Sequence, residues 1–161
     1  MDVDAQIQPL GRGKYWQELA AGDRFRSLRR TVTETDVINF ISSTGMLEAI
    51  FIDATFDGAM AGRPAPGALT CCLIEGLQFQ SLVQETGLAM LELAMQAIKP
   101  VVVGDTIYGL IEIKEIRATS KGGRAVVASE VAVFNQRSEL VMTYSVKRLV
   151  AGRLEQEDVA I

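Results

Sequence analysis

The chain has no histidine among its 161 residues. Histidine is the side chain that most often transfers protons near neutral pH, because its unperturbed pKa lies there. Its absence excludes Ser-His-Asp and Cys-His nucleophilic catalysis, most zinc sites and histidine-ligated haem. Acid–base chemistry is left to carboxylate, lysine, tyrosine and thiol groups. We expect neither a metal ion nor a cofactor.

Cysteine and positive charge are also scarce. The two cysteines, Cys71 and Cys72, are adjacent in an apolar run. Neighbours on a helix diverge by about 100° and rarely form a disulfide, so both are predicted to be buried small apolar side chains. The lack of a disulfide framework indicates a reducing compartment. With 16 lysines and arginines against 20 acidic residues, the net charge is −4, and nucleic acid is not an expected partner.

Targeting signals and long hydrophobic runs are missing as well. Residues 1–10 have neither a basic region nor an apolar run, so no signal peptide is expected. Charged residues such as Glu75 and Glu92 interrupt every apolar stretch before it reaches the roughly 18 residues of a membrane helix. We therefore expect one cytoplasmic domain over residues 1–161, without a membrane partner. Residues 1–13 should form a loose arm and residues 151–161 a solvated acidic tail.

Residues 26–45 predict a strand followed by a helix. The strand is expected over residues 26–33. Thr33 is followed three residues later by Asp36, an acidic variant of the capping box, and apolar residues then recur at helical spacing. Gly45 is typical of the position just beyond a helix end. The next 22 or so residues contain several glycines and prolines, and an irregular segment of such length in a small domain is usually functional.

The longest helix is predicted over residues 68–85, between Pro66-Gly67 and Gly87. Its first half is apolar nearly all round, which is typical of a buried helix. The rest of the chain predicts four strands, at residues 88–98, 106–119, 124–135 and 140–149, and the last three are rich in β-branched residues. A change of parity after Ile113 indicates a bulge near Glu115. Residues 120–123 form a hairpin-turn pattern.

The chain is predicted to have one apolar helix followed by four long antiparallel strands. A sheet that curls around the helix is the arrangement that best buries it. This arrangement is the hot-dog fold, an α+β architecture. A single curled sheet leaves one edge strand unpaired, so a homodimer or higher homo-oligomer is expected.

Several motifs resemble those of the MaoC-like family, which includes the (R)-specific enoyl-CoA hydratases and related acyl-thioester dehydratases. In that family the first helix ends in glycine and is followed by Asp-x-Asn-Pro-x-His-x-Asp, and later by a Gly-Arg-x-Ala-Pro-Gly turn. Here the helix ends at Gly45, the residues from Asp53 follow the histidine position, and residues 62–67 read Gly-Arg-Pro-Ala-Pro-Gly. Residues 103–106, Val-Gly-Asp-Thr, resemble the family's Gly-Asp turn. The resemblance extends from about residue 15 to residue 149.

The chain departs from the family's motif at the positions of the catalytic residues. Met46 stands at the position of the catalytic aspartate and Phe51 at that of the histidine, while Glu48 and Ala49 replace Asn-Pro. The resemblance implies that the family's Asp–His pair handles water and protons, and that N–H groups at the central helix N-terminus polarise the thioester carbonyl. Polarisation of the thioester carbonyl suits Gly67, because the start of a helix offers free N–H donors and glycine permits a thioester to approach the backbone closely.

Each candidate residue has a structural alternative. Gly67, with Pro66 and Ala68, either binds the thioester or only starts the helix. Arg63 either pairs with a CoA phosphate or is a surface arginine satisfied by a carboxylate.

The candidate carboxylates also have a functional and a structural interpretation, and the two dyad positions have an expected structural role. Glu48 is a site carboxylate or a solvated one, and Asp53 is a catalytic group or the N-cap of a short turn over residues 54–58. Met46 and Phe51 are expected to fill the space that an Asp–His pair would occupy.

Three functions follow. The first is an acyl-CoA or acyl-carrier binding member of the hydratase/dehydratase family that lacks its own dyad and serves as a non-catalytic subunit, possible partners being itself and a catalytic homologue. The second is a thioesterase-like hydrolase in which Glu48 or Asp53 activates water. The third is a homodimeric binding module without turnover.

Overall fold

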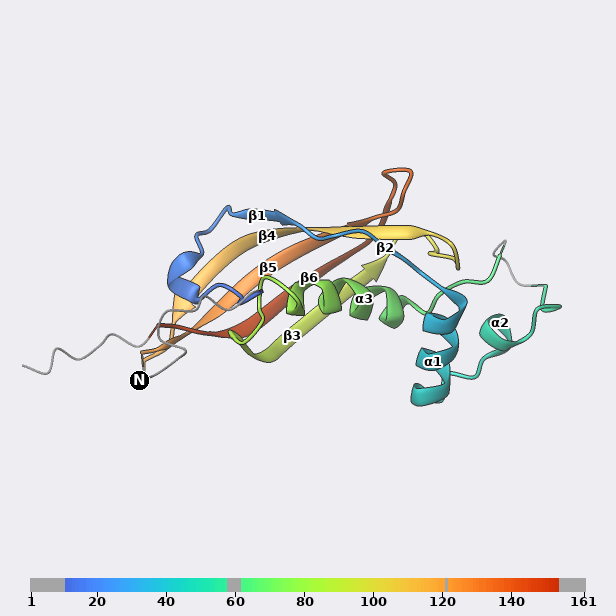
Figure 1. The fold of residues 1–161 in the computed structure, drawn as a ribbon, viewed down its shortest axis with the longest axis horizontal. Coiled ribbons are helices and arrows are strands. Elements are labelled where there is room, and N and C mark those ends of the chain that lie inside the picture. The colour runs from blue at the N-terminus through green and yellow to red at the C-terminus, as the bar shows by residue number, and fades with distance from the viewer. Residues whose placement is uncertain (1–10, 58–61, 121, 154–161) are drawn as a thin grey trace, which may run out of the picture.

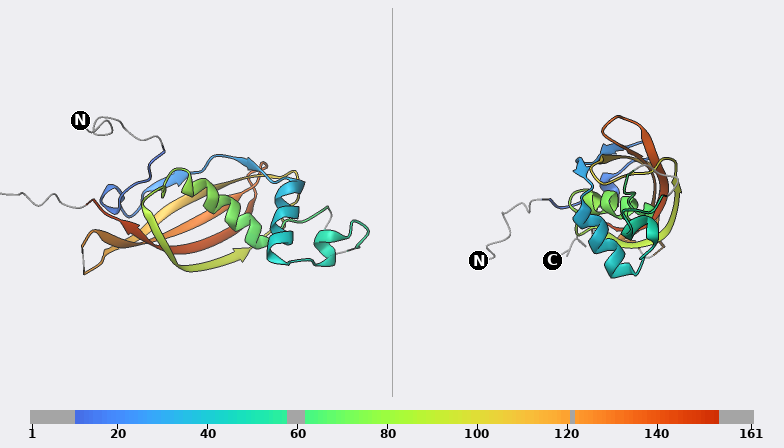
Figure 2. Two further views of the ribbon diagram at one scale, coloured as in Figure 1. Left: turned by 60° about the horizontal axis from the view of Figure 1, so that its bottom comes forward. Right: turned by 90° about the vertical axis from the view of Figure 1, so that its right-hand side faces the viewer.

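An antiparallel sheet wraps around one long helix in the computed structural model, which describes residues 11–57, 62–120 and 122–153 (Figure 1). The sheet order is β1-β4-β5-β6-β3, and β2 pairs with β4 beside β1. The view along the long axis shows the strands curling around the helix, which confirms the predicted α+β hot-dog architecture (Figure 2). The elements are η2 (Trp16–Glu18), β1 (Arg24–Arg26), β2 (Arg30–Thr31), α1 (Glu34–Thr44), α2 (Ala49–Ile52), α3 (Gly67–Phe79), β3 (Gly87–Ala97), β4 (Thr106–Ala118), β5 (Arg124–Phe134) and β6 (Leu140–Ala151).

The four long strands lie within two residues of their predicted bounds. Alternate side chains of β5, such as Val131 and Val133, are buried against the helix, while their neighbours are more exposed. The register of β4 against β5 shifts between Ile113 and Glu115, so the predicted bulge is confirmed. In the turn between these strands Gly122 has a φ of 62°, a conformation that favours glycine. Lys121 of the predicted turn lies outside the described residues.

The central helix α3 is shorter than predicted, because it ends at Phe79 and not at residue 85. The N–H groups of Ser81 and Val83 both donate to the Gln78 carbonyl, and Glu85 adopts a φ of 63°. These turns reverse the chain so that β3 can run back along the sheet beneath the helix. The expected burial of the first half is confirmed on the sheet side, where Leu69 and Leu73 are 5% and 7% exposed.

The prediction that both cysteines are buried is wrong for one of them. Cys71 is buried and Cys72 is exposed. Leu69, Thr70 and Cys71 are all buried, whereas Cys72, about 100° further round the helix than Cys71, lies on the side that the chain leaves uncovered. The first half of α3 therefore has an uncovered apolar side.

The segment before α1 also differs from its prediction. Two short strands, β1 and β2, replace one strand over residues 26–33, and Leu28 between them is 76% exposed. α1 itself begins as predicted, since the Thr33 hydroxyl accepts a hydrogen bond from Asp36 N–H at 3.1 Å and the Asp36 carboxylate accepts one from Thr33 N–H at 2.9 Å. Gly45 ends the helix with a φ of 74°.

Most of the expected arm and tail lies outside the described residues. In the described part of the arm, Gly13 is buried and its N–H donates to the Gln84 carbonyl at 2.8 Å. At the other end, Ala151 is the last residue of β6. A bilayer-spanning length of apolar helix does not occur within the described ranges.

Candidate functional site

The glycine- and proline-rich turn before α3 is fixed against a neighbouring segment. Ala65 N–H donates to the Val101 carbonyl at 2.7 Å, and Val103 N–H donates to the Arg63 carbonyl at 3.0 Å. The turn begins at Gly62, whose φ of 86° favours glycine. Backbone pairing on both sides of Pro64 therefore holds residues 62–67 in one conformation at the start of the helix.

The first turn of α3 presents free backbone donors. The cap residue Pro66 supplies no side-chain acceptor, and the first hydrogen bond of the helix is donated by Thr70 N–H to the Pro66 carbonyl at 3.1 Å. The N–H groups of residues 67–69 have no acceptor within the part of the chain that the structure describes. Free donors at the positive end of a 13-residue helix favour an oxygen that carries negative charge.

Gly67 is not required by the packing of the chain. A Cβ at this position would meet only the Met142 Cε atom, at an ordinary 3.8 Å, and the φ of Gly67 is not in the left-handed region. Glycine within a helix is less favourable than alanine by about 1 kcal/mol. Gly67 is exposed, so the missing side chain leaves the free donors accessible to a molecule outside the chain.

Met46 and Phe51, which the resemblance assigns to the positions of the family's dyad, lie on either side of the start of α2. Phe51 is partly buried and packs against the main core cluster, as expected for a residue that fills space. Met46 follows the end of α1 and is 41% exposed in the single chain, and its expected place in the space of an Asp–His pair stays a prediction.

Arg63 connects the dyad region to the turn before α3. Its Nε and Nη2 groups both donate to the Phe51 carbonyl, at 2.9 and 2.6 Å, and its Nη1 group pairs with Glu34 of α1. The side chain is 33% exposed. The structure therefore brings α1, α2 and residues 62–67 together through one guanidinium group.

The two candidate carboxylates differ in their surroundings. Glu48 is the exposed cap residue of α2 and makes no side-chain cap bond. Asp53 ends α2 and begins a turn, since its carboxylate accepts from the N–H and the hydroxyl of Thr55 at 2.8 and 2.7 Å and its carbonyl accepts from Phe56 N–H at 3.2 Å, as a cap residue would; Gly58 of the expected turn lies outside the described residues. The Thr55 hydroxyl and N–H hold the pKa of Asp53 below its usual range, which makes this carboxylate a weaker base.

A buried polar cluster beneath the middle of α3 was not predicted. Tyr144 O–H and Gln78 Nε2 both donate to Glu75 Oε1 at 2.8 Å, and Arg148 pairs with the other oxygen of Glu75. Burial, followed by the charge of Glu75, raises the pKa of Tyr144. A sequence signal existed, because Glu75 interrupts an apolar helix and Arg148 continues the inward parity of Met142, Tyr144 and Val146.

The remaining groups offer little proton transfer. Burial raises the pKa of the Cys71 thiol to about 12, with a further contribution from Glu75, so this thiol stays protonated near neutral pH. Within the described ranges, no three carboxylate or thiol groups lie close enough together to hold a metal ion. The region around residues 46–67 thus has donors for a carbonyl oxygen and two exposed carboxylates, Glu48 and Asp57, besides the Thr55-bonded Asp53.

This fold and this site define a dehydratase-type hot-dog protein. Residues 20–144 match the family model of the FAS1-like dehydratase domain region, which covers most of the chain. The chain belongs to this family and is a MaoC-like hot-dog protein. The glycine-ended first helix and the turn over residues 62–67, which carried the resemblance in the sequence, both lie inside the matched range.

Solved structures show the same fold. A monoamine oxidase regulatory protein from Archaeoglobus fulgius is 25% identical, with a TM-score of 0.79 over 89% of this chain and 97% of that one. A MaoC-like dehydratase from Rhodospirillum rubrum is 24% identical, with a TM-score of 0.77 over 88% and 99%. The HadBC 3R-hydroxyacyl-ACP dehydratase complex from Mycobacterium tuberculosis is 19% identical, with a TM-score of 0.62 over 80% and 96%. No curated protein matches the sequence.

Proposed function

We propose that this chain binds an acyl thioester at the N-terminus of α3 and acts as a non-catalytic subunit of a hydratase or dehydratase assembly. The observation that carries the proposal is the set of free N–H donors in the first turn of α3. Its N–H donors have no acceptor within the described chain, and Gly67 exposes them without any steric need for glycine. A thioester carbonyl is the ligand chemistry of the family to which the chain belongs, and its oxygen would accept from these donors.

The second part of the proposal rests on the dyad positions. Met46 and Phe51 have no ionisable group, and the nearest carboxylates along the chain are the exposed Glu48 and the Thr55-bonded Asp53. General acid–base catalysis needs a group of suitable pKa within hydrogen-bond reach of the transferred proton. The chain therefore keeps the carbonyl-holding half of the family's site without the proton-transferring half.

A partner subunit is supported by strand β3. It is the last strand of the sheet, paired on one side with β6 only, and its residues are exposed along nearly the whole length. Edge strands of this kind pair readily with another chain. Large apolar side chains on or beside it are 42–50% exposed: Phe79, Leu88, Met90, Leu91, Leu93, Met95 and Ile98. The similar HadBC protein is a complex of subunits, which agrees with a homodimer that exchanges into a heterodimer with a catalytic homologue.

A binding experiment tests the first part. Butyryl-CoA titrated into the purified chain by calorimetry should bind, and Gly67→Ala should weaken binding by about tenfold or more, since the added methyl obstructs the approach to the donors. Gly76→Ala is the matched control, because it lies in the same helix and its Cβ would meet nothing within 4 Å. Equal effects of the two substitutions, or no binding by the unmodified chain, would refute the proposal.

The hydrolase alternative makes a different prediction at the same site. Because Asp53 is held by Thr55, a hydrolase would depend on Glu48. Release of free CoA from butyryl-CoA by the isolated chain, lost in Glu48→Gln, would establish hydrolysis and would replace the non-catalytic role. Binding without release, unaffected by a catalytic homologue, would identify a binding module.

A further inference from the structure

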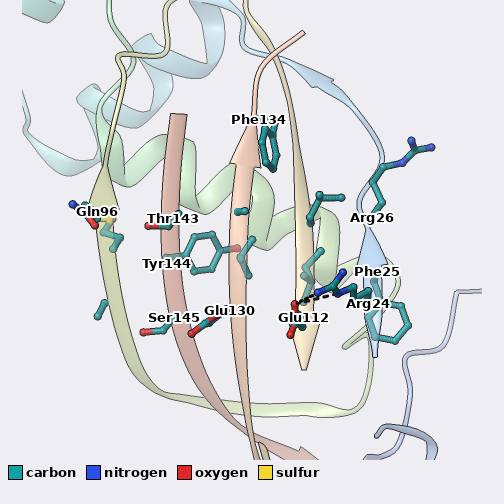
Figure 3. A pocket seen from close by; sticks show the side chains of 16 residues that line it. Arg24, Phe25, Arg26, Gln96, Glu112, Glu130, Phe134, Thr143, Tyr144 and Ser145 are labelled. Atoms are coloured by element: carbon teal, nitrogen blue, oxygen red, sulfur yellow. Dashed lines mark hydrogen bonds and ion pairs between the residues drawn. The ribbon is translucent and has the colours of Figure 1, made fainter. Parts of the chain in front are cut away.

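A hollow of about 880 Å³ lies on the outer face of the sheet, on the side away from α3 (Figure 3). Strands β1, β3, β4, β5 and β6 all contribute to its lining, and no residue of α2, residues 62–67 or α3 does. Its volume is within the range of about 300–1,000 Å³ that is typical of ligand sites. The hollow is therefore separate from the site at the N-terminus of α3.

A row of paired residues crosses the floor of the hollow. Arg26 of β1 is opposite Leu110, and Leu110 is opposite Ala132. Ala132 is opposite Thr143, which is opposite Gln96 of β3. Five strands at a spacing of about 4.8 Å make this row roughly 19 Å long. Along the row the side chains change from a cation through an apolar and small middle to a hydroxyl and an amide.

The neighbouring row balances its own charges. Arg24 pairs with Glu112 at 3.0 Å, and Lys114 bridges Glu112 and Glu130 at 2.9 and 3.5 Å. Two cations thus accompany two carboxylates. Arg26 is exposed and has no acidic partner among the residues that the structure describes, so it is the unbalanced charge of the hollow.

An apolar wall borders the row on its other side. Phe134 lines the hollow and stacks on Tyr108 with ring centroids 5.7 Å apart. Leu110 on the floor is 42% exposed, although it lies near the middle of the sheet. Apolar surface beside the Arg26 guanidinium group complements a ligand with an apolar body and an anionic end, and a second guanidinium group, that of Arg29, lies 4.7 Å from the centroid of the Tyr108 ring.

We propose that this hollow binds an elongated amphiphile with an anionic head. The head pairs with Arg26, and the apolar chain lies over Leu110 and Ala132 towards Gln96. Another subunit added at the edge of β3 would extend the sheet sideways and leave its outer face open, so this site is compatible with assembly through β3.

The experiment uses the full-length chain and two probes with different anionic heads, dodecanoate and dodecyl phosphate, below their micelle concentrations. Calorimetry should show saturable binding of one molecule per chain for at least one of them. Dodecyltrimethylammonium, with the same chain and a cationic head, should bind at least about tenfold more weakly. Preference for one anionic head assigns the ligand as a carboxylate or a phosphate amphiphile.

Substitutions locate the binding. Arg26→Gln should remove the preference for the anionic head, whereas Arg124→Gln, an exposed arginine outside the hollow, should leave it unchanged. Ser145→Trp fills the hollow and should abolish binding. Lys147→Trp adds the same ring two residues further along the same face and should not. Thermal unfolding checks that each variant is folded. If Ser145→Trp is not folded, the test rests on whether Arg26→Gln removes the preference for the anionic head.

Two results would overturn the proposal. One is binding that is indifferent to head charge and to Ser145→Trp. The other is sedimentation showing that the unmodified chain forms an assembly that Ser145→Trp, but not Lys147→Trp, reduces in mass. The hollow would then be an interface between copies of the chain.

Discussion

The Arg148 guanidinium and the Glu75 carboxylate form an ion pair beneath α3, and both side chains are only 7% exposed. Gln78 and Tyr144 complete the hydrogen bonding of one Glu75 oxygen, and the ring of Phe79 lies 5.6 Å from the Arg148 guanidinium. Ionic groups this deeply buried are tolerated only when each is paired. The cluster therefore fixes α3 at one position along β6.

Removing one partner of this pair should be costly. Glu75→Ala leaves Arg148 buried and unpaired, and we expect a loss of about 3–5 kcal/mol in the free energy of unfolding. The double variant Glu75→Leu/Arg148→Met, which removes both charges, should recover most of that loss. Urea unfolding followed by circular dichroism measures both. A double variant less stable than Glu75→Ala would show that the pair does not act in this way.

The capping box of α1 should give a pH-dependent stability. Partial burial raises the pKa of Asp36, but the Thr33 N–H and hydroxyl and the Arg30 guanidinium lower it by more, so the pKa lies below its usual range. The stabilisation is complete above the pKa of the unfolded chain, about 3.9, and is lost as the pH falls below it towards the folded pKa.

The comparison for this prediction is Asp36→Asn. At pH 7 the variant should be about 1 kcal/mol less stable in urea, and between pH 5 and pH 2 it should lose less stability than the unmodified chain. Asp57→Asn, at an exposed position, is the control and should follow the unmodified chain. Parallel pH curves for all three proteins would contradict the role of Asp36.

The isolated chain should have no substantial enoyl-CoA hydratase activity. Positioned acid–base groups contribute about 10²–10⁴-fold, so hydration of crotonyl-CoA should be at least a hundredfold below a typical turnover of about 10 s⁻¹. Met46→Asp with Phe51→His should not restore it, since Phe51 packs against the core and Met46 is exposed. Hydration by the unmodified chain and by the double variant is measured as the loss of absorbance of the conjugated thioester. A turnover near 10 s⁻¹ in the unmodified chain would disprove the expected inactivity, and the same turnover in the double variant would disprove the expected failure to restore it.

The chain should be a dimer at micromolar concentration. Light scattering should give about twice the mass of the 17.5 kDa chain. Leu93→Glu on β3 should shift it towards the monomer, because a buried unpaired carboxylate opposes association. Leu28→Glu, at a residue 76% exposed between β1 and β2, is the matched control. A stable monomer of the unmodified chain would also remove the basis for pairing with a catalytic homologue.

The sheet was predictable from the sequence because its signals are local. Alternating β-branched residues and turn glycines indicated β4, β5 and β6, and the parity change after Ile113 placed the bulge, whereas β3 has no β-branched residue and was indicated by its position after the helix. The end of α3 was not predictable in this way. Residues 80–85 are acceptable in a helix, and the helix ends there because β3 has to return along the sheet, which is a tertiary requirement.

The sequence indicated the motifs of the candidate site and not its contacts. The Gly-Arg-Pro-Ala-Pro-Gly motif of residues 62–67 was evident from the sequence, and the assignment of Met46 and Phe51 to the dyad positions stays a prediction. The two hydrogen bonds from Arg63 to the Phe51 carbonyl join residues 12 positions apart through a backbone atom, and no side-chain pattern records such a bond. The pairing of Glu75 with Arg148, 73 positions apart, is hidden for a similar reason, although each residue is unusual in its own segment.

The anchoring of α2 has an evolutionary consequence. Arg63 binds the main chain of position 51, so the hold on the loop is the same whichever amino acid occurs there. An exchange of histidine for phenylalanine at this point would keep the attachment of the loop and would need no compensating change at Arg63. Loss of chemistry and retention of architecture are thereby separable, and this is the condition under which a duplicated enzyme gene can persist as the scaffold for its active relative.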